Sequence, residues 1–144
     1  MNLFGVLEVS GSALGAERQR AEVVASNMAN AETTHTEEGG PYRRKLVMFH
    51  AYRMQQLPML LAGMQNASSR GVRVQQVVAD PSPPMQRYQP GHPDADARGY
   101  VAYPAINPVE EMADMLGAVR AYELNASVLQ SAKSMIQQSI EILR

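Results

Sequence analysis

The sequence predicts an α+β protein: two long terminal helices, packed as an antiparallel coiled-coil-like pair, flank a small β-rich and proline-rich middle region. Apolar residues at both ends recur with alternating spacings of three and four, which is the period of a helical seam. In the middle, β-branched residues alternate with polar ones. We therefore predict one structural unit with an N-terminal arm over 1–34, a middle region over 35–106 and a C-terminal arm over 107–144.

The N-terminal helix follows from a row of residues in which only two are polar. The row consists of Leu3, Leu7, Ser10, Leu14, Glu17, Ala21, Val24, Met28 and Ala31. Side chains with this spacing lie on one face of a helix and can pack against a partner helix.

The C-terminal helix repeats the pattern and has a clear start. Asn107 can cap it, Pro108 suits the first helical position, and Glu110 can reach back as in a capping box. Its row consists of Met112, Met115, Val119, Tyr122, Ala126, Leu129, Lys133, Ile136, Ile140 and Leu143, which only Lys133 interrupts.

We predict an assembly seam from the two rows. It comprises Leu7, Leu14, Ala21, Val24 and Met28 of the first helix, with Met112, Met115, Val119, Tyr122, Leu129, Ile136, Ile140 and Leu143 of the second. Pairing the one charge in each row, Glu17 with Lys133, would also place Met28 opposite Tyr122. The alternative is that Lys133 extends to water and Glu17 faces solvent.

The middle region contains three strand candidates, which are 43–49, 72–78 and 100–103. Seven of the nine prolines fall between Pro81 and Pro108, so no long helix can form there. Tyrosines and Ile106 can anchor that stretch as an ordered, extended connection. The pattern of residues 51–70 is interrupted by Pro58 and Gly63 and leaves their structure open.

Composition excludes several classes of function. The chain has no cysteine, which removes disulfides, thiolate nucleophiles and Cys-based zinc sites. Its net charge of −1 gives no reason to expect nucleic-acid binding. Residues 39–79 carry six basic groups and no acid, which suits either a solvated face or acidic neighbours in an assembly. No apolar run is long enough for a membrane span, and Met1–Ser10 lacks the basic start of a cleaved signal peptide.

One cluster of possible metal ligands stands out, formed by His92, Asp94 and Asp96. Its spacing resembles the start of a calcium loop, but Arg98 and Ala105 occupy positions where that loop needs ligands. No nucleophile-elbow or phosphate-binding motif is present. We therefore expect no metal, no cofactor and no catalytic residue, and a structural rather than an enzymatic role.

The segment from Val23 to Thr34 resembles the N-terminal signature of flagellar basal-body rod and hook proteins, in which a helix ends at an Ala-x-Asn-x-Ala-Asn stretch. The matching residues are Ala25, Asn27, Ala29, Asn30, Thr33 and Thr34, and Pro41 and Tyr42 belong to a second similar stretch over 38–45. Further stretches over 80–84, 90–96, 99–104, 107–112, 120–125 and 132–135 are similar to the C-type proximal rod proteins of that family. Residues 51–70, His35 and Glu37 depart from the pattern.

The resemblance implies a non-catalytic subunit that assembles helically through its terminal helices, transmits torque and lines an export channel. It also implies export without a cleaved signal by the flagellar type III apparatus, and a place in the periplasmic part of the rod. The implied partners are copies of the chain, other rod subunits and the ring-to-rod adaptor. The alternatives are another proximal-rod subunit, the adaptor itself, or a metal-dependent enzyme using His92, Asp94 and Asp96.

Overall fold

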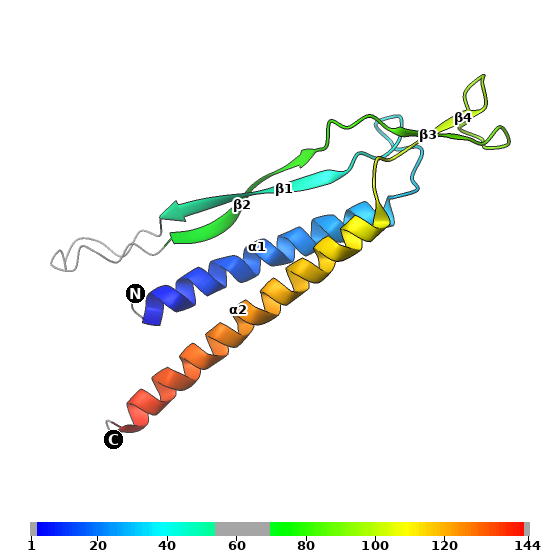
Figure 1. Cartoon of the computed structure of the whole chain (residues 1–144). Helices are drawn as coiled ribbons and strands as arrows, with labels where there is room; N and C mark the ends of the chain where they lie inside the picture. The colour runs from blue at the N-terminus through cyan, green and yellow to red at the C-terminus, as the bar shows by residue number, and fades with distance from the viewer. Residues whose placement is uncertain (1–2, 54–69, 143–144) are drawn as a thin grey trace. The chain divides into compact units, whose positions relative to one another are not determined.

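The computed structural model describes residues 3–53 and 70–142, and it confirms the α+β class (Figure 1). The elements in chain order are α1 (Leu3–Ala29), β1 (Lys45–Arg53), β2 (Arg70–Ala79), β3 (Met85–Tyr88), β4 (Tyr100–Tyr103) and α2 (Pro108–Ile142). The two long helices run in opposite directions. None of the described helices combines the length and the hydropathy needed to cross a membrane.

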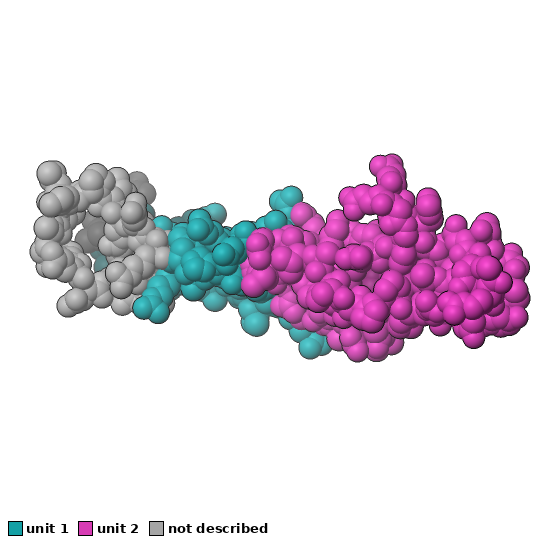
Figure 2. All heavy atoms as spheres, turned by 90° about the horizontal axis from the view of Figure 1, so that it is seen from above, with its two compact units in different colours: residues 1–19, 49–75, 118–144 teal, residues 20–48, 76–117 magenta. Residues whose placement is uncertain are grey.

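The chain forms two compact units, which Figure 2 distinguishes by colour. Unit 1 comprises Met1–Gln19, Phe49–Gln75 and Ala118–Arg144, and unit 2 comprises Arg20–Met48 and Gln76–Gly117. Both helices and the β1–β2 ribbon contribute residues to each unit.

The cores of the two units differ in kind. Unit 2 buries large side chains, namely those of Val24, Val101, Tyr103, Pro104 and Ile106. The buried side chains that the structure describes in unit 1 are small ones, those of Ser10, Ala16, Ala118 and Ala132. Because hydrophobic stabilisation scales with buried apolar area, the described part of unit 2 gains more from its buried side chains than the described part of unit 1.

The start of α2 confirms the capping prediction. The side-chain Oδ1 of Asn107 accepts the backbone N–H of Val109 at 3.1 Å, as an N-cap does. The contact of Glu110 differs from that in a capping box. Its Oε1 accepts a hydrogen bond from the side-chain amide of Asn107 at 3.1 Å, not from the backbone N–H of that residue. Pro108 occupies the first helical position.

The strands form two separate two-stranded sheets, β1–β2 and β3–β4. The predicted strands over 43–49, 72–78 and 100–103 correspond to β1, β2 and β4. Strand β3 was not predicted; it pairs antiparallel with β4, from Met85 opposite Tyr103 to Tyr88 opposite Tyr100. Of the stretch left open over 51–70, residues 51–53 end β1 and Arg70 begins β2, and residues 54–69 lie outside the described part.

Gly99 closes the loop between β3 and β4 and cannot be replaced without strain. Its φ is +80°, and an added Cβ would lie 2.9 Å from Cε2 of Tyr88 and 3.1 Å from Cβ of Pro90. We expect Gly99→Ala to destabilise the fold by about 1–3 kcal/mol. Thermal unfolding followed by circular dichroism measures this cost. Gly91→Ala is the matched control, because a Cβ at Gly91 meets nothing within 4 Å; equal losses in the two variants would contradict the explanation.

Candidate functional site: the arm junction

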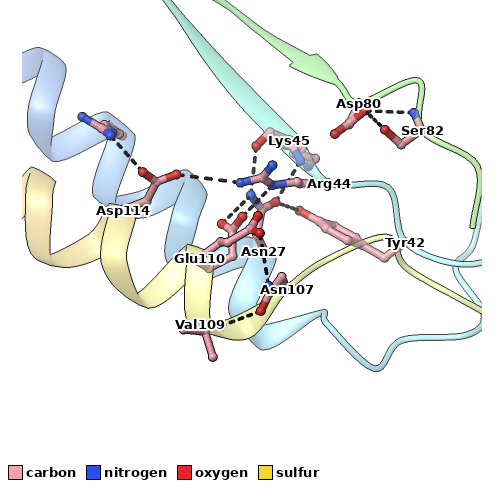
Figure 3. A network of polar contacts seen from close by, with 12 residues as sticks. Asn27, Tyr42, Arg44, Lys45, Asp80, Ser82, Asn107, Val109, Glu110 and Asp114 are labelled. Carbon is pink, nitrogen blue, oxygen red and sulfur yellow. Dashed lines mark hydrogen bonds and ion pairs between the residues drawn. The ribbon is translucent and has the colours of Figure 1, made fainter. Parts of the chain in front are cut away.

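Asn27 occupies the centre of a polar network in unit 2, where the end of α1 meets the start of β1 and the start of α2 (Figure 3). We call residues 20–45 and 107–114 the arm junction. The Oδ1 of Asn27 accepts the backbone N–H of Lys45 at 2.8 Å, and its Nδ2 donates to the Lys45 carbonyl at 2.9 Å. The amide therefore pairs with Lys45 at two points, as the backbone of a neighbouring strand would.

Two further bonds complete the hydrogen-bonding capacity of Asn27. Its Nδ2 donates to Oε2 of Glu111 at 3.0 Å, and its Oδ1 accepts the hydroxyl of Tyr42 at 3.2 Å. The side chain thus makes all four bonds that an amide can make. Asn27 and Glu111 are each only 1% exposed.

A chain of ion pairs continues from Glu111 to α1. The Nε of Arg44 donates to Oε1 of Glu111 at 2.6 Å, and Nη2 of Arg44 lies 3.8 Å from Oδ2 of Asp114. Asp114 in turn accepts a hydrogen bond from Nη2 of Arg20 at 3.2 Å. Four residues from three segments are therefore held together, and the buried carboxylate of Glu111 has both an ionic and an amide partner.

The other signature residues shape the chain as it leaves α1. The Nδ2 of Asn30 donates to the Ser26 carbonyl at 2.9 Å, and the hydroxyl of Thr33 donates to Oδ1 of Asn30 at 3.2 Å. The backbone N–H of Tyr42 donates to the Thr33 carbonyl at 3.0 Å, so the chain turns back on itself. Asn30, Thr33, Thr34, Pro41 and Tyr42 are half-buried, and Ala25 and Ala29 are exposed. The predicted end of the helix at this stretch is confirmed, because α1 ends at Ala29.

The three residues considered as metal ligands, His92, Asp94 and Asp96, form hydrogen bonds within the loop between β3 and β4 and to Thr34. Nδ1 of His92 accepts the backbone N–H of Asp94, and Oδ2 of Asp94 accepts the hydroxyl of Thr34 at 2.7 Å. Oδ1 of Asp96 accepts the backbone N–H groups of Arg98 and Tyr100. Across residues 3–53 and 70–142, no three His, Asp or Glu side chains are grouped closely enough to bind a metal ion.

Local hydrogen bonds lower the pKa values of two carboxyl groups, those of Asp80 and Asp96. The backbone N–H of Tyr100 is the main cause that lowers the pKa of Asp96 below its usual value. The hydroxyl of Ser82 is the main cause that lowers the pKa of Asp80, which also accepts the backbone N–H of Ser82. Hydrogen bonds that favour the ionised form have this effect. Because both pKa values are lowered, the contribution of these bonds to stability is lost only as the pH falls below about 4.

The second feature of the site is the surface of α2, which exposes many large apolar side chains. These are Val109, Met112, Leu116, Val119, Tyr122, Leu124, Val128, Met135, Ile140 and Ile142. At 100° per residue, eight of them form two stripes on opposite flanks of the buried face of α2. The first stripe is Val109, Met112, Leu116 and Val119, and the second is Leu124, Val128, Met135 and Ile142. Exposed apolar side chains that gather in this way are typical of protein–protein interaction sites.

The predicted seam is divided between packed and exposed positions. Val24 is buried, and Leu7, Leu14, Ala21, Met28, Met115, Leu129 and Ile136 are half-buried. Met112, Val119, Tyr122 and Ile140 are exposed, and Leu143 lies outside the described residues. In α2 the buried face instead contains Glu111, Ala118 and Ala132. Each of these residues comes one position before a member of the predicted row, namely Met112, Val119 and Lys133.

The predicted register of the two helices is wrong. It placed Met28 opposite Tyr122, whereas Asn27 bonds to Glu111 and Arg20 to Asp114. Glu111 and Tyr122 are separated by roughly 16 Å along α2. The apolar spacing did not determine the register because buried polar partners select another one. Glu17 is half-buried and Lys133 is exposed.

Comparison with known families agrees with this architecture. The chain matches two family models, "Flagella basal body rod protein" over residues 7–34 and "Flagellar basal body rod FlgEFG protein C-terminal" over residues 97–142. Together they cover most of both helical arms, the signature over 23–34 and the arm junction's part of α2. The fold and the matched segments define a structural subunit of the flagellar basal-body rod.

Full-length relatives narrow the assignment. The chain is 41% identical to the flagellar basal-body rod protein FlgC of Borreliella burgdorferi, covering 100% of this chain and 99% of the relative. It is 38% identical to FlgC of Bacillus subtilis, covering 99% of each, and 37% identical to FlgC of Salmonella typhimurium, covering 99% and 98%. The chain belongs to the FlgC family of flagellar basal-body rod proteins.

Proposed function

We propose that this rod subunit assembles helically through its terminal arms, 1–34 and 107–144, and presents the middle region 35–106 as an outer layer. In this arrangement the arms line the export channel and transmit torque along the rod. The observation that carries the proposal is the pair of exposed apolar stripes on α2, in which Leu116 is 57% and Leu124 is 69% exposed.

Two stripes on opposite flanks favour a polymer over a closed complex. Each stripe needs a cover to remove its apolar side chains from water. One helix with two such flanks can contact two neighbouring subunits through different surfaces, and contacts of this heterologous kind build a helical filament when the rotation between subunits does not close a ring. An adaptor that binds one partner would need only one stripe.

The proposal includes the location and the partners of the chain. The subunit would leave the cell interior through the flagellar type III export apparatus without a cleaved signal. It would be built into the periplasmic part of the rod, beside copies of itself, other rod subunits and the ring-to-rod adaptor. We propose no enzymatic activity and no cofactor.

Deleting the gene in its host and examining isolated basal bodies by electron cryo-microscopy tests the proposal. We expect non-motile cells whose basal bodies lack the rod, and restoration of both when the gene is returned on a plasmid. Density for α1 and α2 in the inner tube of the restored rod would support the arrangement. Complete rods in the deletion strain, or density for this chain only in a closed ring, would contradict it.

A further inference from the structure

The arm junction holds α1 and α2 in a register that their apolar spacing alone does not determine. Pairing Glu17 with Lys133 would place apolar residues opposite each other, with Met28 facing Tyr122, yet the structure joins Asn27 to Glu111 at 3.0 Å. Regular apolar rows are compatible with several registers, because sliding one helix by a whole repeat again places apolar residues opposite each other. Some other interaction must therefore distinguish the observed register from its alternatives.

The polar network provides that distinction. Sliding α1 along α2 would separate Asn27 from Glu111, and would leave two side chains that are now 99% buried without these partners. A buried polar group without a partner loses its hydration and gains nothing in return. Arg44 adds to the effect, because its contacts with Glu111 and Asp114 also fix where the β1 segment meets α2.

We propose that Asn27 is the positioning residue that sets the axial register of α1 against α2, and with it the point where β1 begins. Asparagine suits this role because its amide donates to Glu111 and also pairs with both backbone groups of Lys45. Aspartate could not donate, and its carboxylate would face that of Glu111. Leucine would fill the space but leave Glu111 and Lys45 without these bonds. The inference concerns a single chain, so it holds or fails independently of rod assembly.

Chemical cross-linking of the full chain can read the register, because the protein has no cysteine of its own. Arg20→Cys with Asp114→Cys reports the observed register, since their native side chains meet at 3.2 Å. Ala21→Cys with Leu129→Cys reports the register that pairs Glu17 with Lys133, in which Ala21 would face Leu129. With Asn27 present, a short bismaleimide should link the first pair and not the second. In an Asn27→Leu background we expect the yield of the first link to fall at least fivefold.

Asn30→Leu is the matched control. Asn30 lies three residues away in the same signature, but the hydrogen bonds described for its side chain are to Ser26 and Thr33, next to the end of α1. Cross-linking in this background should therefore match that of the parent. An unchanged yield in Asn27→Leu, or an equal loss in Asn30→Leu, would overturn the proposal.

A donor–acceptor exchange keeps the test decisive if Asn27→Leu does not fold. Asn27→Asp should reduce the first cross-link, because two carboxylates would face each other. Adding Glu111→Gln supplies a donor from the opposite side, and we expect it to restore at least half of the parent yield. Failure of the double variant to exceed Asn27→Asp would sink the idea, since a residue with a purely local role would show no such coupling.

Discussion

Arg44→Met should lower the free energy of unfolding by about 3–5 kcal/mol, because it leaves the buried carboxylate of Glu111 without its cation. The Arg44–Glu111 contact is 2.6 Å, and the Glu111 side chain is 1% exposed. Asn27 alone cannot neutralise the charge. Urea denaturation of the full chain, followed by circular dichroism, measures the change.

Removing both charges should cost less than removing one. In Arg44→Met, Glu111→Leu no unpaired charge remains, so we expect a smaller loss than in Arg44→Met. Arg98→Met is the matched control, because Arg98 pairs with Asp96 at 3.5 Å but is 79% exposed. Exposed pairs contribute about 0–1 kcal/mol. Equal losses for Arg44→Met and Arg98→Met would show that burial does not strengthen the role of this ion pair.

Met112→Glu with Leu116→Glu should abolish motility and leave the folded monomer intact. These side chains are 55% and 57% exposed, so their replacement removes little packing within the chain. At the proposed interface, however, each new carboxylate would be buried without a partner. Swimming in soft agar and electron microscopy of basal bodies measure assembly, and circular dichroism of the purified variant measures the fold.

Two comparisons isolate the effect of the stripes. Leu124→Glu with Val128→Glu should have the same outcome, because it disrupts the second stripe. Ser127→Glu with Ser131→Glu is the control, because it adds the same charge at two exposed positions of α2 that are already polar and lie four residues apart, as in the stripe variants. Cells with this variant should swim. Motility in either stripe variant would remove that stripe from the proposed interface, and loss in the serine variant would show that charge on α2 is itself harmful.

Local patterns were sufficient to predict the helices and most of the strands. The start of α2 depends on Asn107 and Pro108, which act on their own immediate neighbours, so the sequence alone placed it correctly. The end of α1 at Ala29 and strand β2 likewise follow from short stretches of chain. Strand β3 could not be predicted because all four of its residues are exposed, so its sequence has no alternation of apolar and polar residues. Its partner β4 also follows only after an eleven-residue loop.

The arm junction could be predicted only in part. The family signature pointed to Asn27, but nothing nearby in sequence marks Glu111 as buried. An acidic residue in the first turn of a helix is ordinarily explained by the helix dipole. Its burial depends on Arg44, 67 residues away, and on Asn27, 84 residues away. The helix register depends on the same distant partners, and for this reason the pairing of Glu17 with Lys133 gave the wrong one.

The small buried side chains described in unit 1 imply that its two helical segments deform more easily than those of unit 2. Large side chains interlock between helices and resist sliding or rotation. The alanine side chain is short and has no rotamers. Small displacements of the helices at Ala16, Ala118 and Ala132 should therefore cost little free energy. The polar network and the large core of unit 2 do not permit such adjustment. In a rod built from this subunit, we therefore expect elastic deformation to concentrate in the alanine-lined parts of the helices, while the geometry at each arm junction stays fixed.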